Sequence, residues 1–169
     1  MHVREWILVA TLAACSGLPL ARRSPLPQQN LPLRVRSAPL AVTLAHYRVT
    51  LAADAWLNFQ PGSFDSESHS RVPMNVYVRL TSTDSRPIPP NIMVDSVYAT
   101  RGDSSFSWGE LLKAPARDGQ PVTGEYQTFG GPRWALSADS VDVAVRVKDT
   151  RTGITVILRA PRVRLASVS

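Results

Sequence analysis

Apolar and polar residues alternate along most of the chain after residue 39. Apolar residues hold the odd positions of 47–59 and the even positions of 72–80, and four valines alternate with other residues at 141–147. Successive side chains of a β-strand point to opposite faces of a sheet, so this period of two predicts strands with one buried face. No stretch of ten or more residues beyond the N-terminus shows a helical period.

The breaks between these runs are typical of turns. Residues 40–44 alternate with the opposite parity to 47–59, which predicts a bulge or bend between them. Arg101-Gly102-Asp103 predicts a tight turn, and 149–153 predicts the loop of a hairpin. Residues 113–138 are rich in proline and glycine and are expected to form a long connection with one short strand near 124–128.

The expected fold class is therefore all-β. About seven short strands separated by proline and glycine turns predict an antiparallel sandwich like that of immunoglobulin or fibronectin type III domains. A small open barrel is the alternative. The chain has a single cysteine, so the disulfide core of antibody domains is absent and only the architecture carries over.

The N-terminus carries the most specific motif. Residues 6–14 form a nine-residue apolar run, which suits the core of a secretory signal but is too short for a bilayer span of about 20 residues. Leu12-Ala13-Ala14-Cys15 ends this run and contains the sole cysteine. These residues resemble the lipobox of bacterial lipoprotein signals, which reads Leu-(Ala/Ser)-(Gly/Ala)-Cys.

The resemblance implies a location in the cell envelope. It implies that residues 1–14 are removed as a signal peptide and that the Cys15 thiol takes a diacylglyceryl group, with fatty acylation (palmitate) of the new amino group. Ser16 follows the cysteine where an aspartate would favour retention in the inner membrane, so the outer membrane is expected. An ordinary secretory signal, cut after Ala14 or Ala21, is the alternative. The later pattern resembles that of bacterial envelope lipoproteins with an immunoglobulin-like sandwich.

Residues 15–38 are expected to form a disordered, lipid-anchored linker before a sandwich domain at 39–169. Five of the 14 prolines lie between Ser16 and Pro39, and proline favours extended backbone. The alternative is that 31–35 forms a first edge strand.

The charge distribution argues against a nucleic-acid partner. The net charge is +6, but residues 16–38 contain four arginines and no acid, whereas 39–169 contain 14 basic and 12 acidic residues. The excess positive charge thus lies beside the anchor, where anionic lipid headgroups attract it.

The sequence offers little for catalysis. His46 and His69 are the histidines left after signal removal, and no Gly-x-Ser-x-Gly nucleophile elbow is present. We therefore expect no enzyme activity, no catalytic residue, no metal site and no cofactor.

Two outward aromatic residues are the best candidates for binding. If odd positions of 47–59 are buried, Trp56 faces outward, and Tyr77 does so on the next strand. The candidate binding residues are Trp56, Asn58, Gln60, Tyr77, Arg79 and Trp134. Aromatic rings beside amides suit a sugar or a protein partner. The alternative is that 113–138, with Trp134, covers this face.

The function expected is thus a lipid-anchored envelope protein with a non-catalytic binding or structural role. A partner protein of the envelope is one expected ligand. A glycan- or peptidoglycan-binding module and a secreted sandwich without an anchor are the alternatives.

Overall fold

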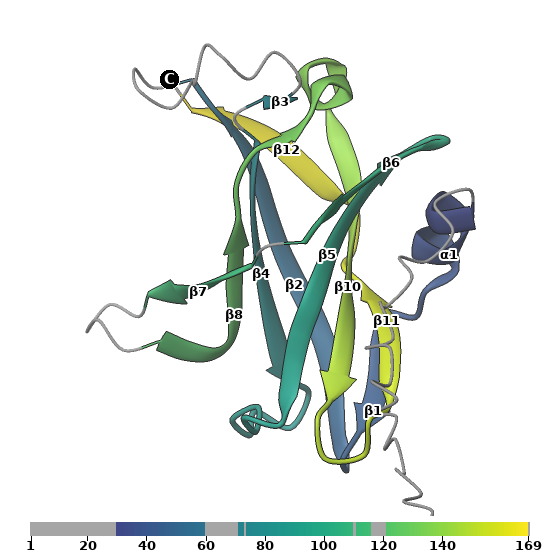
Figure 1. Cartoon of the computed structure of the whole chain (residues 1–169), viewed down its shortest axis with the longest axis vertical. Coiled ribbons are helices and arrows are strands. Elements are labelled where there is room, and N and C mark those ends of the chain that lie inside the picture. Colours follow the sequence, from purple (N-terminus) through teal and green to yellow (C-terminus); the bar gives the residue numbers. More distant parts are fainter. Residues whose placement is uncertain (1–29, 60–70, 73, 110, 116–120, 169) are drawn as a thin grey trace, which may run out of the picture.

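The computed structural model describes residues 30–59, 71–72, 74–109, 111–115 and 121–168 (Figure 1). Strands dominate these residues. The elements are α1 (Leu31–Ser37), β1 (Ala41–Leu44), β2 (Tyr47–Asn58), β3 (Arg71–Val72), β4 (Met74–Ser82), β5 (Ile92–Arg101), β6 (Ser104–Trp108), β7 (Leu112–Pro115), β8 (Pro121–Thr128), β9 (Gly131–Pro132), the 3-10 helix η2 (Arg133–Ser137), β10 (Ser140–Asp149), β11 (Thr155–Arg159) and β12 (Val163–Val168). The all-β prediction is confirmed.

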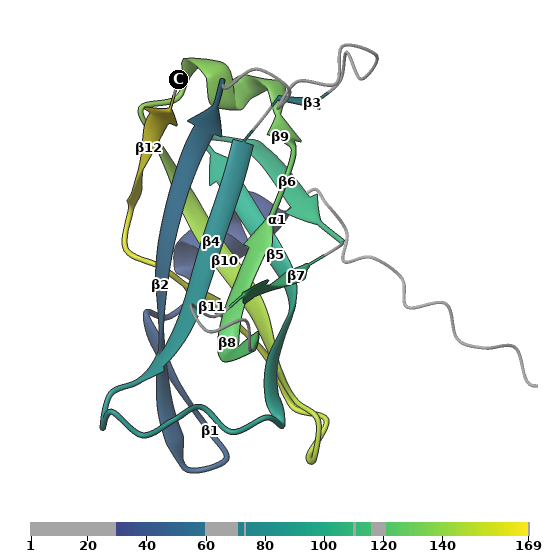
Figure 2. The same ribbon diagram turned by 90° about the vertical axis from the view of Figure 1, so that its left-hand side faces the viewer.

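The main strands form two facing layers of a sandwich-like fold. The hydrogen-bonded order is β6-β5-β10-β12-β2-β4-β8-β7, with β1 paired to β2 and β11 paired to β10. Strand β12 joins the layers, because it pairs antiparallel with β10 and parallel with β2. The prediction of a purely antiparallel sandwich is therefore wrong at this one strand pair. Figure 2 shows the β2–β4–β8 layer in front of β5 and β10.

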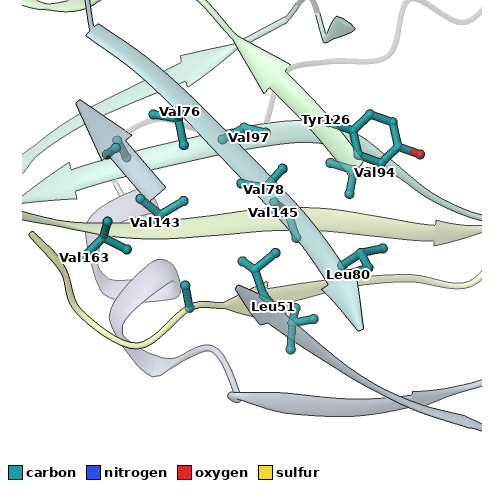
Figure 3. Packing of buried hydrophobic residues seen from close by; sticks show 14 of the residues in the cluster. Leu51, Val76, Val78, Leu80, Val94, Val97, Tyr126, Val143, Val145 and Val163 are labelled. Atoms are coloured by element: carbon teal, nitrogen blue, oxygen red, sulfur yellow. The ribbon is translucent and has the colours of Figure 1, made fainter. Parts of the chain in front are cut away.

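The core lies between these layers and follows the predicted alternation. Val76, Val78 and Leu80 point inward from β4, and Val143 and Val145 meet them from β10 (Figure 3). These four valines are fully buried. Each buried valine or leucine contributes roughly 1.5–3 kcal/mol through removal of apolar surface from water, so this alternation is the main stabilising feature of the fold.

The break in parity after residue 44 is a hairpin, which is tighter than a bulge or bend. Strands β1 and β2 pair antiparallel with Leu44 opposite Tyr47. Ala45 and His46 form the two-residue turn between them, with φ angles of 47° and 68°. Positive φ at both central residues is typical of the type I′ turn, whose twist matches that of paired strands. His46 is exposed in this turn.

Helix α1 lies within the segment 15–38 that the sequence predicted to be a linker. Leu31 and Val35 are buried against Tyr98, Ala144 and Ile157, on the outer surface of the β5–β10–β11 layer. Residues 30–38 therefore belong to the folded domain, and the alternative edge strand is wrong as well. A helix of seven residues has fewer than two turns, which is too short to give a helical period in the sequence. Residues 1–29, including Cys15, lie outside the described residues.

The expected connection at 113–138 contains more structure than predicted. Strands β7 and β8 extend the layer beside β4, and β9 and η2 follow at one end of the sandwich. The described residues thus contain twelve strands in place of about seven. Gly124, with a φ of +86°, lies within β8 and makes this strand hard to recognise from its residues.

Candidate functional site

The outward side chains of β2, β4 and β8 form a continuous surface, called the open face below. Strand register places Trp56 opposite Asn75 and Asp54 opposite Tyr77. The next pairing places Gln127 opposite Tyr77 and Glu125 opposite Arg79. The open face consists of Asp54, Trp56, Asn75, Tyr77, Arg79, Glu125 and Gln127. Trp56, Tyr77 and Arg79 therefore share one face, as their positions in the sequence suggested.

The open face is not crossed by any described element. Figure 2 shows β2 and β4 with no described helix or strand in front of them, whereas α1 packs on the outer surface of the other layer. Trp56 and Tyr77 are half-buried, and Asn75 is 8% exposed. In the described part of 113–138, β7 and β8 extend the layer beside β4, so the expected cover is not found there.

The other candidate residues lie in different places. Trp134 is part of η2 and packs against the core cluster at the end of the sandwich, so it does not share a strand face with Trp56. Asn58 ends β2, half-buried and in register with Val168 of β12. Gln60 lies outside the described residues.

Tyr77 is held by a carboxylate on the neighbouring strand. Partial burial, together with a hydrogen bond donated by its hydroxyl to Glu125, raises the pKa of Tyr77 from about 10 to about 12. Arg79 Nη1 lies 4.0 Å from Glu125 Oε1 and partly offsets this effect. The phenol is therefore neutral across the physiological range.

A polar cleft continues the open face beyond Arg79. It has a volume of about 470 Å³ and lies where β4 and β8 meet the loop at 83–90. Its lining residues are Arg79, Leu80, Thr81, Ser82, Ser85, Arg86, Pro87, Ile88, Thr123 and Glu125.

Arg86 is fixed at the wall of this cleft. Its guanidinium pairs with Asp84, donates to the His46 carbonyl oxygen at 3.2 Å, and lies 4.4 Å from the centroid of the Tyr47 ring. Sequence reasoning missed the cleft because its residues come from three separate segments. Its only signal was the run of prolines in the loop, which excluded a helix there.

A second hollow lies between β6 and the β7–β8 pair, at the open edge of the sandwich. This edge groove has a volume of about 370 Å³ and is lined by Phe106, Ser107, Trp108, Gly109, Leu112, Gln127 and Phe129. The rings of Phe106 and Trp108 meet edge to face with centroids 4.9 Å apart. The Trp108 indole donates to the Gly130 carbonyl oxygen at 2.8 Å, which ties β6 to the chain following β8.

The open face and its cleft offer groups suited to binding. They combine two aromatic rings with amide, hydroxyl, guanidinium and carboxylate groups, which supply both donors and acceptors of hydrogen bonds. Within the described ranges, no group of three or more His, Cys, Asp or Glu side chains is placed to hold a metal ion. His69 lies outside these ranges.

Comparison of the chain with protein-family models, with curated proteins and with solved structures gives no match. Any assignment of function therefore depends on the residues themselves. Among the residues that the structure covers, no helix has the length and apolar character needed to cross a membrane.

Proposed function

We propose that this chain is a lipid-anchored protein of the cell envelope that binds an envelope polysaccharide, without chemical change, through the open face. The observation that supports this most directly is the asymmetry of the two outer surfaces. One is covered by α1, whereas the other carries Trp56 and Tyr77 beneath no described element. A surface of aromatic and amide groups that lies beneath no described helix or strand is typical of a binding site.

The chemistry of the open face suits sugars. The apolar C–H face of a sugar ring packs on a flat aromatic ring, and its hydroxyl groups require both donors and acceptors. Gln127 lies beside Tyr77, is half-buried and supplies both kinds of group, whereas Asn75, beside Trp56, is buried. The neutral Tyr77 hydroxyl lies beside Glu125 and adds a further polar group to this surface.

The anchor is proposed on the lipobox resemblance at Cys15. Helix α1 begins at residue 31, so the proposed linker is shortened to residues 15–29. Those 15 residues reach at most roughly 45 Å if extended. The anchored domain would therefore work close to the membrane surface, and its polysaccharide would be one within that reach.

Metabolic labelling tests the anchor. Cells that produce the wild-type chain take up a clickable palmitate analogue into this protein, and the Cys15→Ser variant takes up none. A wild-type chain that carries no label would support the secreted alternative without an anchor.

Retention on insoluble envelope polysaccharide tests the open face. Trp56→Ala is expected to lose retention, because it removes the largest aromatic surface of the face. Leu33→Ala is the matched control, since Leu33 is a 67% exposed apolar residue on α1 at the opposite surface. Equal retention of both variants would contradict the proposal.

We propose that the fold is a variant of the immunoglobulin or fibronectin type III sandwich. We also propose that the protein lies at the outer membrane, on its periplasmic side or on its surface side. The two facing layers with a buried valine-rich core support this architecture. The parallel pairing of β12 with β2 departs from a purely antiparallel plan.

The edge groove supports a second candidate function, the binding of a partner protein of the envelope. Phe129 is 49% exposed and Leu112 is 50% exposed, and both line the groove beside Trp108. An extended apolar segment fits such a groove between strand edges. If this function is correct, Phe129→Ser loses a partner that copurifies from detergent-solubilised membranes, while retention on polysaccharide is unchanged.

A further inference from the structure

We propose that the polysaccharide is a neutral chain of N-acetylated amino sugars, and that one sugar unit is seated in the cleft lined by Arg79, Thr123 and Glu125. This inference rests on the proposed function, because it names the ligand of the same face. Three independent features carry it: the charge balance, the amide groups beside the aromatic rings, and the composition of the cleft.

The charge balance favours a neutral ligand. Both arginines that line the cleft already have a carboxylate partner, since Arg79 lies 4.0 Å from Glu125 and Arg86 pairs with Asp84. Asp54 adds a further negative charge on the open face. An acidic polysaccharide would have to displace these carboxylates, and it would be repelled by Asp54. A neutral chain neither displaces these carboxylates nor is repelled by Asp54.

The amide groups favour N-acetylated sugars. Gln127 lies opposite Tyr77 and is half-buried, so this ring has an accessible primary amide on the neighbouring strand, whereas Asn75, opposite Trp56, is buried. An acetamido group has one N–H donor and one carbonyl acceptor, and a side-chain amide offers the complementary pair. The methyl of the acetamido group adds apolar contact with the rings, which a plain hydroxyl does not supply.

The cleft has the composition expected of a subsite for one sugar ring. Exposed Pro87 gives it an apolar portion, and the hydroxyls of Thr81, Ser82, Ser85 and Thr123 give it a polar one, whereas the side chains of Leu80 and Ile88, which also line it, belong to the core. Its volume of about 470 Å³ falls within the range of about 300–1,000 Å³ for ligand pockets.

The cleft and the open face form one path for a chain. Arg79 and Glu125 belong to both, so the two regions adjoin each other. Asn75 and Arg79 are separated along β4 by about 14 Å, at 3.4 Å per residue. A chain of several linked rings is therefore needed to reach from Trp56 into the cleft.

Calorimetry on the full chain in detergent tests the inference with two related probes. Chitotetraose is a tetramer of N-acetylglucosamine, and cellotetraose has the same linkage without acetamido groups. We expect chitotetraose to bind about tenfold more tightly, a difference of about 1.4 kcal/mol. Equal binding of both probes, or tighter binding of a galacturonic acid tetramer, would overturn the assignment.

Two variants test the role of the cleft. Thr123→Trp fills the cleft from an exposed position on β8, and Thr123→Ser keeps the hydroxyl as its matched control. We expect Thr123→Trp to weaken chitotetraose binding about tenfold but to leave chitobiose binding unchanged, since the shorter probe rests on the open face alone. Unchanged chitotetraose binding would show that no sugar unit enters the cleft.

The outcomes separate this inference from the proposed function. If chitotetraose does not bind, but retention on envelope polysaccharide still depends on Trp56, the ligand assignment fails and the proposed function stands. If retention is independent of Trp56 as well, both fail.

Discussion

The hydrogen bond from Tyr77 to Glu125 gives the sharpest prediction about the open face. Tyr77→Phe removes the hydroxyl and keeps the ring, so it tests this contact without removing the aromatic surface. Tyr47→Phe is the matched control, because Tyr47 is also half-buried and its contact with Arg86 depends on the ring.

The size of the effect follows from the two partners. A hydrogen bond to a charged acceptor contributes about 1.5–3 kcal/mol when buried. Tyr77 is half-buried and the Glu125 side chain is 17% exposed, so solvent reduces the contribution. We expect Tyr77→Phe to lower the free energy of unfolding at pH 7 by about 1 kcal/mol.

Partial burial of Tyr77 and its hydrogen bond to Glu125 together predict a dependence on pH. The folded pKa of Tyr77 is about 12, against about 10 in the unfolded chain. Because the pKa is raised by folding, the stabilisation is fully present below pH 10 and is lost as the pH rises through 10 to 12. At pH 11 the loss relative to pH 9 amounts to about 1 kcal/mol. Tyr77→Phe does not have this loss, so the two proteins converge in stability.

Urea unfolding at pH 7, 9 and 11 measures this convergence, and tyrosinate absorbance measures the titration. Tyr77→Phe is expected to lose a tyrosine that ionises near pH 12 in the wild type, and Tyr47→Phe to keep it. Burial raises the pKa of Tyr126 too, and its late ionisation should remain in both variants. A constant difference in stability between wild type and Tyr77→Phe across this range would refute the raised pKa of Tyr77, to which burial and the hydrogen bond to Glu125 both contribute.

Three further substitutions test the packing and hydrogen bonding of the fold. Thr100→Val should raise the free energy of unfolding by about 1 kcal/mol in urea, because the buried Thr100 hydroxyl has no hydrogen-bond partner in the described part of the chain; a loss of stability would contradict this. Gly131→Ala should lower it by about 1–3 kcal/mol, because a Cβ there would lie 2.5 Å from Met74 Cβ; an unchanged melting temperature would show that Met74 moves aside. Hydrogen bonds from Asn91, the Arg151 backbone and Thr152 lower the pKa of Asp149, so Asp149→Asn should destabilise the protein at pH 7. The lowered pKa means that this stabilisation is present at neutral pH and is lost as the pH falls, so thermal melts of wild type and variant should converge under acidic conditions.

The sequence predicted the elements that obey a simple period. The valines of β10 and the alternation in β2 and β4 placed both buried faces correctly, and the same alternation placed Trp56 and Tyr77 outward together. This succeeds because burial of one face imposes a period of two on a strand, whatever its partners are.

The features that the sequence did not predict depend on contacts between distant segments. Helix α1 is stabilised by Tyr98 and Ile157 and has fewer than two turns, so its own residues carry no period. The cleft combines β4, β8 and the loop at 83–90. The parallel pairing of β12 with β2 depends on the position that β12 takes by pairing with β10. The spacing of residues along the chain does not predict such contacts between distant segments.

The indole N–H signals of the tryptophans test the central claim most directly. In a two-dimensional NMR titration of the protein with solubilised envelope polysaccharide, we expect the Trp56 signal to shift. The signals of Trp108, in the edge groove, and Trp134, against the core, should stay in place. A shift of Trp108 alone, or no shift of Trp56, would contradict the account in which the open face binds the polysaccharide.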